Sequence, residues 1–424
     1  MSTHQPTRSV QLLDTTLRDG EQTPDVAFSA DEKLQIAEQL LERVGVHRVE
    51  VCSALVSPGE QATAARLARW ARSCGRLEQL EALGYADGGR SVEWLRAAGL
   101  LRMNLLVKGS ERHCRLQLRM SPEEHLQRVD STLQAAAGAN VQVSGVYLED
   151  WSRGCRESPA YVAAVLSALR EGGVSRVYLA DTLGVLAPEE VFRQVRRVRR
   201  AFPELQLEFH GHDDYGLATA NCLAAVRAGV SGLHTTVNGL GERAGNACLA
   251  QVVVALRDHA RVHTGVNEAH LYELSQRVAA ASGQGVAHNA PLLGASVFTQ
   301  TAGIHADGDA KAALYCSELT PERFSRRREY ALGKLSGRAS LAHHLRALGV
   351  ELAPAREREL LDQLLARVVE LGDRKERVRP TDLQRWLDPA HVMLDSCGRV
   401  QKGAPLGADE EPDCDGLAGV APVA

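Results

Sequence analysis

The sequence predicts an α/β protein with a (β/α)8 barrel (a TIM barrel) followed by a mostly helical accessory region. Short apolar, β-branched runs alternate with longer stretches of helical periodicity, which is typical of βα units around a parallel sheet. Eight such runs occur before residue 240, the number that a closed barrel requires. The 424 residues are 44% hydrophobic, enough for a large core. An open doubly wound sheet is the alternative, and the strand count disfavours it.

The strands are expected where an apolar run ends in polar residues. They are predicted at residues 9–14, 48–53, 80–85, 102–107, 143–150, 176–181, 205–212 and 231–238. Helices are expected between them, for example over 29–45, where Ser29 can cap the first turn and the Leu/Ile spacing marks one buried face.

The character of the chain changes after the last predicted barrel helix. We expect the catalytic barrel to span residues 1–285, and a Gly/Ala-rich linker with a first accessory subdomain to span 286–340. A helical pattern over 341–390 predicts a second accessory subdomain. Residues 391–424 are rich in Gly, Pro and acidic residues and are predicted to be a disordered tail.

Composition excludes several classes of function. The formal net charge is −4 with nearly balanced acids and bases, so no broad positive field for nucleic acid is expected. The nine cysteines form no CxxC pair, which favours a reduced compartment and argues against a zinc–cysteine site. The start lacks a signal-type apolar segment, and no apolar run is long enough to cross a membrane. We therefore expect a cytoplasmic protein without a membrane partner.

Polar residues recur where the predicted strands end. Four charges, Asp14, Arg18, Asp19 and Glu21, accompany the end of the first strand. In a barrel the carboxyl ends of all strands share one face, which carries the active site. The polar residues expected at that face are Arg18, Asp19, Tyr147, Glu149, Thr182, His210, His212 and Asn238.

A metal site is the first chemical hypothesis. His210 and His212 are two residues apart, so on one strand both imidazoles point to the same side. Together with Asp19 they form an N/O ligand set that suits Mg, Mn or Zn and leaves positions open for substrate. Two histidines satisfied by local hydrogen bonds are the alternative. Asn246 could add an amide oxygen.

Other segments allow more than one interpretation. The Gly-rich stretch 238–250 could bind a phosphate or be a tight loop without a ligand. Glu149 could act in acid–base chemistry or simply pair with an arginine. The segment 301–315 holds His305, Asp307 and Tyr315, which could supply a base from the accessory region or lie in an exposed loop. The basic run 324–330 is expected to be a solvated face, or to meet the phosphates of an acyl carrier.

Five longer motifs resemble one family. They are LLDTTLRDGEQTP (12–24), FHGHDDYGLATAN (209–221), LHTTVNGLGERAGNACL (233–249), FTQTAGIHADGD (298–309) and YALGKLSGRASL (330–341). In this order they resemble the acyl-CoA-condensing branch of the DRE-TIM metallolyases, which comprises isopropylmalate, homocitrate and citramalate synthases. The resemblance covers residues 9–390. VYLEDWSRG and ADTLGVL look most like the (R)-citramalate synthase type, which takes pyruvate.

The resemblance implies a Claisen-type condensation of acetyl-CoA with a 2-oxo acid, followed by thioester hydrolysis. It assigns a divalent metal to Asp19, His210, His212 and Asn246. Arg18 would stabilise the developing alkoxide, and Thr182 and Tyr147 would hold the substrate carboxylate and line its pocket. Catalysis would involve Glu149 together with His305, Asp307 and Tyr315 of the accessory region. The resemblance also implies a homodimer.

The oxo acid is inferred from the room for its side chain. By resemblance, Leu83, Leu106 and Tyr147 frame the pocket, and a narrow apolar pocket favours pyruvate over 2-oxoisovalerate or 2-oxoglutarate. The regulatory domain of longer members is not found in the pattern, so feedback control is not expected. A lyase of the same superfamily and an inactive binding subunit are the remaining alternatives.

Overall fold

The computed structural model describes residues 9–350 and 354–387. The predicted tail 391–424 lies outside these described residues. The chain divides into two compact units: Met1–Phe298 with Cys316–Arg328, and Thr299–Tyr315 with Glu329–Ala424. The first unit therefore extends to Phe298, past residue 285. It also includes a second, separate segment of the chain, Cys316–Arg328.

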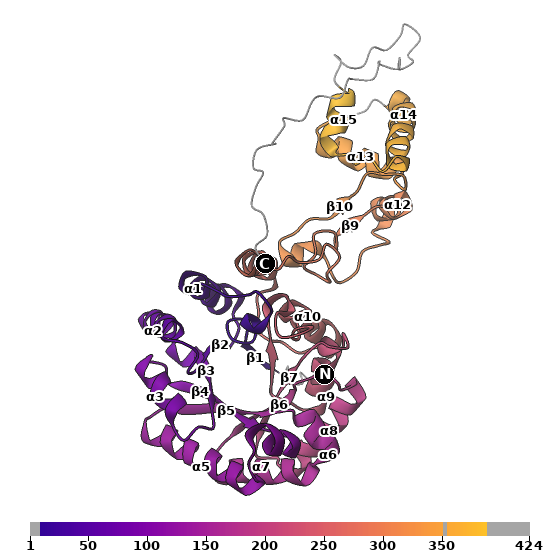
Figure 1. The fold of residues 1–424 in the computed structure, drawn as a ribbon. Coiled ribbons are helices and arrows are strands. Elements are labelled where there is room, and N and C mark those ends of the chain that lie inside the picture. The colour runs from indigo at the N-terminus through magenta and orange to yellow at the C-terminus, as the bar shows by residue number, and fades with distance from the viewer. Residues whose placement is uncertain (1–8, 351–353, 388–424) are drawn as a thin grey trace, which may run out of the picture. The chain divides into compact units, whose positions relative to one another are not determined.

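The first unit contains a closed barrel of eight parallel strands (Figure 1). The strands are β1 Gln11–Asp14, β2 Arg48–Ser53, β3 Leu80–Tyr85, β4 Arg102–Lys108, β5 Gln142–Glu149, β6 Arg176–Asp181, β7 Gln206–Gly211 and β8 Gly232–Thr235. Each overlaps its predicted run, and β8 pairs with β1 to close the ring. The predicted TIM barrel is confirmed.

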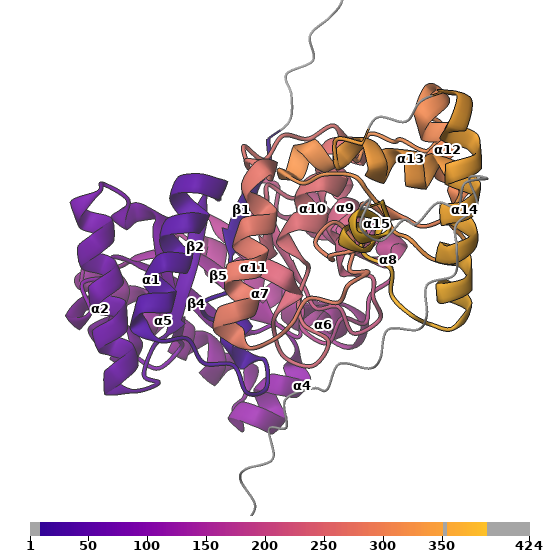
Figure 2. The ribbon, with the colours of Figure 1, turned by 90° about the horizontal axis from the view of Figure 1, so that it is seen from above.

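Helices surround the ring of strands (Figure 1). They are α1 Ala30–Glu38, α2 Pro58–Ser73, α3 Arg90–Ala97, α4 Glu111–His113, α5 Pro122–Gly138, α6 Trp151–Glu157, α7 Pro159–Glu171, α8 Pro188–Ala201, α9 Ala218–Ala228, α10 Leu249–Ala255 and α11 Leu271–Ser282. Helix α11 packs beside α1 (Figure 2), where Arg277 donates to Gln39 Oε1 at 2.7 Å. No helix within the described ranges is long and apolar enough to cross a membrane.

Helix α1 begins as its sequence predicts. Ser29 and Glu32 form a capping box, which satisfies two backbone donors at the helix start. The predicted helix continues past α1 as a π-helical turn over Gln39–Val44, which ends at Gly45 with φ +81°. Glycine adopts this left-handed conformation without steric cost.

The strands divide their side chains between two environments. In β2, Val49 and Val51 belong to the apolar layer between strands and helices, whereas Arg48 and Glu50 are buried polar residues at the alternate positions. Because side chains alternate along a strand, these two charged residues project into the barrel. The interior is thus partly polar, and it leads to the carboxyl ends of the strands.

The second unit has a small core of its own. A two-stranded parallel sheet joins β9 (Thr299–Gln300) to β10 (Glu329–Tyr330). Its helices are α12 Gly303–Ala312, α13 Arg338–Ala347, α14 Pro354–Asp373 and α15 Pro380–Leu387. The core residues are Leu341, Leu345, Leu361, Leu364, Val368, Val378 and Leu383. The helical accessory region is confirmed.

Candidate active site

The carboxyl ends of β1 and β7 bring Asp19, His210 and His212 together, and all three are buried. One ligand atom from each lies within 4.8 Å of the others. The two Nε2 atoms are 3.3 Å apart, and His210 Nε2 is 3.4 Å from Asp19 Oδ2. The histidines therefore point to the same side, as their spacing predicted.

These residues fit a bound cation. Asn246 donates from Nδ2 to Asp19 Oδ1 at 3.0 Å and to Leu240 O at 3.0 Å. Its Oδ1 is buried and has no hydrogen-bond partner within the described part of the chain. A carboxylate and two imidazole nitrogens thus lie close together, next to a residue whose amide oxygen has no partner in the described ranges, and such N/O sets suit a divalent ion.

Glycines explain how the loop after β8 delivers Asn246. A Cβ on Gly241 would lie 2.1 Å from Asn246 Nδ2, and one on Gly245 would lie 1.8 Å from Gly239 O. Both positions also have positive φ, +154° and +84°, which side chains rarely adopt. The Gly-rich stretch therefore folds tightly against Asp19, and these glycines serve that close approach.

The ionisation of the three residues suits metal binding. Burial alone would raise the pKa of Asp19, but chiefly the Arg18 guanidinium, aided by the Asn246 hydrogen bond, lowers it to about 2. Burial lowers the pKa of His210 well below its ordinary value, and it lowers that of His212. A carboxylate with neutral imidazoles is the protonation state that metal ligands require.

Arg18 is fixed beside this set by three groups. Its Nε donates to Glu50 Oε2 at 2.6 Å and its Nη1 to Asp19 Oδ2 at 3.0 Å. Its Nη2 donates to the Tyr147 hydroxyl at 3.4 Å. A guanidinium held in one orientation next to a cation site can stabilise negative charge that develops on a substrate oxygen.

The other charges near the first strand have different partners. Asp14 accepts from the Thr16 amide at 3.0 Å, and Glu21 pairs with the buried Lys33 at 2.6 Å. Neither carboxylate forms a hydrogen bond or ion pair with Asp19, His210 or His212 within the described ranges. Asp14 Oδ2 is buried without a hydrogen-bond partner among the described residues, whereas Glu21 also accepts from the Phe28 amide at 2.8 Å.

The predicted substrate pocket forms one apolar cluster. Leu83 and Tyr147 are buried together with Leu13 and Tyr178, and Leu106 packs against them. Thr182 follows β6, and its Oγ1 accepts from the Asp150 amide at 2.8 Å.

Glu149 ends β5 and is partly buried. Its carboxylate pairs with Lys108 of β4 and lies 3.9 Å from His113 Nδ1. The sequence left open that Glu149 pairs with an arginine at the end of its strand. It does have a cationic partner, but that partner is Lys108. Sequence reasoning missed Lys108, although it ends a strand in the same way.

The three accessory residues lie within the second unit. His305 and Tyr315 contact each other, with ring centroids 4.2 Å apart, and Asp307 pairs with Lys311 at 2.6 Å. His305 and Asp307 lie on α12 and not in a loop.

The basic run 324–330 is not simply a solvated face. Arg326 donates to the Gly294 carbonyl at 2.8 Å and lies over the Tyr272 ring at 4.3 Å. It serves the packing of the first unit.

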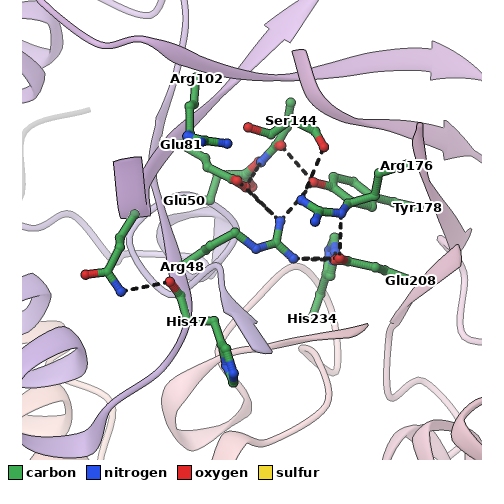
Figure 3. A network of polar contacts seen from close by, with 12 residues as sticks. His47, Arg48, Glu50, Glu81, Arg102, Ser144, Arg176, Tyr178, Glu208 and His234 are labelled. Atoms are coloured by element: carbon green, nitrogen blue, oxygen red, sulfur yellow. Dashed lines mark hydrogen bonds and ion pairs between the residues drawn. The ribbon is translucent and has the colours of Figure 1, made fainter. Parts of the chain in front are cut away.

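A second polar cluster fills the barrel interior and was also missed. Arg48 donates from Nη2 to both Glu208 oxygens at 2.7 Å and from Nη1 to Glu81 at 3.2 and 3.3 Å. Figure 3 shows its guanidinium between the two glutamates. Asn104 then joins Glu81 to Glu50 at 3.0 and 2.7 Å. Through Glu50 this cluster reaches Arg18.

Comparison with known proteins gives the family. The HMGL-like family model matches residues 9–278, and the homocitrate synthase post-HMGL domain-like model matches residues 292–376. Two relatives come from Methanopyrus kandleri. One, provisionally named (R)-citramalate synthase CimA, is 38% identical and covers 89% of this chain and 72% of its own. Homocitrate synthase AksA is 36% identical over 88% of this chain and 91% of its own.

A solved structure agrees on the fold. The crystal structure of hydroxymethylglutaryl-CoA lyase from Pseudomonas aeruginosa matches with a TM-score of 0.55 at 25% identity, covering 66% of this chain and 95% of that one. The buried Asp/His/His group fits a metal site of the kind expected in such enzymes. The chain belongs to the HMGL-like family and, within it, to the group of citramalate, homocitrate and isopropylmalate synthases.

Proposed function

We propose that this enzyme condenses acetyl-CoA with pyruvate to give (R)-citramalate and free CoA. The observation that carries the proposal is the buried Asp19–His210–His212 set with Arg18 fixed beside it. The (R)-citramalate synthase name of the 38% identical relative supports the same reaction.

The reaction requires four changes of bonding. A base removes a proton from the acetyl methyl group, and the resulting carbanion forms a C–C bond to the ketone carbon of pyruvate. The ketone oxygen becomes an alkoxide and takes up a proton. Water then cleaves the thioester, which releases CoA as a thiol.

The residues have distinct roles in this proposal. Asp19, His210 and His212, with Asn246, would hold a divalent ion, which supplies Lewis acidity toward the ketone and carboxylate when bound. Arg18 stabilises the alkoxide, because its guanidinium is already oriented by Glu50 and needs no rearrangement. Thr182 contributes to binding the substrate carboxylate.

Proton transfer is assigned to four residues. By the resemblance to the family, Glu149 would take part in this step, and so would His305, Asp307 and Tyr315 of the accessory region. A homodimer is part of the proposal, and the mass in solution tests it.

Pyruvate is favoured by the close packing of the apolar side chains that are proposed to line the pocket. Leu83, Leu106 and Tyr147 pack against one another, so the methyl group of pyruvate fits where an isopropyl group would need space. Each extra methylene in a pocket changes binding by only about 1–3 kcal/mol. The enzyme is therefore expected to prefer pyruvate without rejecting larger 2-oxo acids completely.

A panel of 2-oxo acids tests the proposal. The purified enzyme is supplied with acetyl-CoA and Mg²⁺, Mn²⁺ or Zn²⁺, and thiol release is followed with pyruvate, 2-oxobutyrate, 2-oxoisovalerate and 2-oxoglutarate. We expect the highest kcat/KM with pyruvate and (R)-citramalate as product. A higher value with 2-oxoisovalerate or 2-oxoglutarate would assign the chain to isopropylmalate or homocitrate synthesis. No thiol release with any acid would reject condensation altogether.

A further inference from the structure

A hydrogen-bonded chain runs from the barrel interior to the pocket wall. His234 lies on β8 and is 1% exposed. Its Nδ1 is 2.9 Å from the Tyr147 hydroxyl, and its Nε2 is 3.1 Å from Glu208 Oε2. The sequence provided no reason to select His234. It lies within β8, whereas the polar residues expected at the active-site face lie at the ends of the strands or follow them.

The direction of these hydrogen bonds follows from the charges around Glu208. Arg48 binds both oxygens of Glu208 at 2.7 Å, and Arg176 lies 3.1 Å from Oε1. Figure 3 shows His234 and Arg48 converging on this carboxylate. With two cations beside it, Glu208 is an acceptor, so His234 Nε2 carries a proton. With the proton on Nε2, Nδ1 is the nitrogen that accepts a hydrogen bond from the Tyr147 hydroxyl.

The backbone makes room for this arrangement. A Cβ on Gly232, two residues before His234 on the same strand, would lie 2.5 Å from the Glu208 carboxyl carbon. Only glycine there lets the carboxylate lie beneath the imidazole. The orientation of His234 is therefore determined by the strand sequence of β8 as well as by its partners.

The Tyr147 hydroxyl has little else to hold it. Its other contacts, to Arg18 Nη2 and Glu50 Oε2, are each 3.4 Å long, compared with 2.9 Å to His234. The ring packs edge-on against Tyr178, His210 and His234. A buried hydroxyl that loses its main partner seeks another or admits water, and either change moves the ring.

We propose that His234 is a positioning residue that determines which 2-oxo acid is accepted, by holding the Tyr147 ring as a wall of the pocket. The inference rests on the proposed function, because Tyr147 is taken to line the substrate pocket. It acts through Tyr147 and Arg18 and does not itself contact substrate. Release of the Tyr147 hydroxyl should enlarge the pocket, lower kcat/KM for pyruvate and favour 2-oxobutyrate.

Three variants test this inference. His234→Leu removes both hydrogen bonds, and His234→Gln restores a group that can accept from Tyr147 and donate to Glu208. The control is His125→Leu, because the Tyr161 hydroxyl lies 2.8 Å from His125 Nδ1 in a second buried tyrosine–histidine pair outside the barrel interior. We measure kcat and KM for pyruvate and 2-oxobutyrate, together with thermal stability.

The expected result is a change in preference. The ratio of kcat/KM for pyruvate to that for 2-oxobutyrate should fall about tenfold or more in His234→Leu. It should return to within about threefold of the original in His234→Gln. His125→Leu should lose stability and keep the original ratio. An unchanged ratio in His234→Leu, or an equal change in His125→Leu, overturns the inference.

If His234→Leu does not fold, Tyr147→Phe removes the other half of the same hydrogen bond. It should shift the ratio in the same direction, and an unchanged ratio would again overturn the inference. Crystal structures of His234→Leu and His234→Gln separate this inference from the proposed function. If the unaltered enzyme releases no thiol with any 2-oxo acid, condensation is rejected together with the specificity role. A displaced Tyr147 ring in His234→Leu alone still supports positioning, and an unmoved ring refutes it.

Discussion

Two buried polar clusters lie in the same barrel, and they differ in how their atoms are paired. In the interior cluster (Arg48, Glu81, Asn104, Tyr178 and Glu208), every carboxylate oxygen faces a donor. In the metal cluster (Asp19, His210, His212 and Asn246), Asp19 accepts from Asn246 Nδ2 and Arg18 Nη1, but the two histidine Nε2 atoms face each other at 3.3 Å and Asn246 Oδ1 is without a hydrogen-bond partner among the described residues. Buried acceptors without donors are costly. The carboxylates of the interior cluster are therefore paired within it, whereas the metal cluster keeps a buried acceptor that a cation would satisfy.

The largest expected effect comes from removing a ligand of the metal cluster. His212→Ala should lower thiol release on the order of 10⁴-fold, the scale seen when one member of a catalytic set is deleted. The metal content of the purified protein, measured by mass spectrometry, should fall in parallel. If the variant kept both its metal and its activity, His212 would not be a metal ligand and the distinction between the two clusters would fail.

Breaking the interior cluster should instead affect folding. Arg48→Met leaves Glu208 and Glu81 buried without their main cation, which should lower the free energy of unfolding by about 3–5 kcal/mol. Urea denaturation measures this change, and metal content should be preserved in the folded variant. The control is Arg66→Met, which breaks an exposed pair with Asp31 and should cost no more than about 1 kcal/mol.

Asn246 sharpens the comparison within the metal cluster. Asn246→Ala removes one acceptor and the donor to Asp19, so metal affinity should fall about 10- to 100-fold, with activity largely recovered at saturating metal. Metal titration measures the affinity. Asn238→Gly is the control, because Asn238 in the same loop contacts Ser275 instead and has φ +59°, which glycine tolerates. Equal losses in both variants would assign the effect to the loop.

Asp14 is another buried carboxylate, and no cation among the described residues forms an ion pair with it. Burial raises its pKa from 3.8 to about 7, whereas the partners of Asp19 and Glu208 lower theirs to about 2. Between pH 4 and 7 the folded protein thus retains a proton that the unfolded chain has lost. The contribution of Asp14 to stability is present below pH 4, falls as the pH rises to 7 and then levels off.

Asp14→Asn should remove this pH dependence. Denaturation at pH 4, 5.5 and 7.5 should show the variant gaining stability relative to the original protein as the pH rises, by about 4 kcal/mol in all. A constant difference between the two proteins would mean that Asp14 ionises normally when folded.

The sequence predicted the barrel well because strand position depends on local pattern. Runs such as 48–53 and 176–181 coincide with β2 and β6, since β-branched residues bounded by polar ones are recognisable one segment at a time. The proximity of Asp19 to His210 and His212 followed from the topology alone.

The polar interior could not be predicted in the same way. Arg48 and Glu50 alternate with Val49 and Val51 in β2, a pattern that equally suits a strand with one face in water. Only closure of the barrel turns that face inward, where Glu208 and His234 from distant strands complete it. The pairing of Glu21 with Lys33 could not be predicted either, because the two residues are 12 positions apart and no local pattern links them.

The return of Cys316–Arg328 to the barrel unit means that the chain passes between the two units three times. Phe324 in this segment packs with Phe298 and Val254, and Arg323 pairs with Asp258 and Glu268. Truncating the chain after residue 298 would therefore remove Cys316–Arg328, which is part of the barrel unit. To isolate the barrel, residues 299–315 should be replaced by a short linker and the chain should end after residue 328. The contacts of Phe324 and Arg323 with the barrel are then kept on one polypeptide.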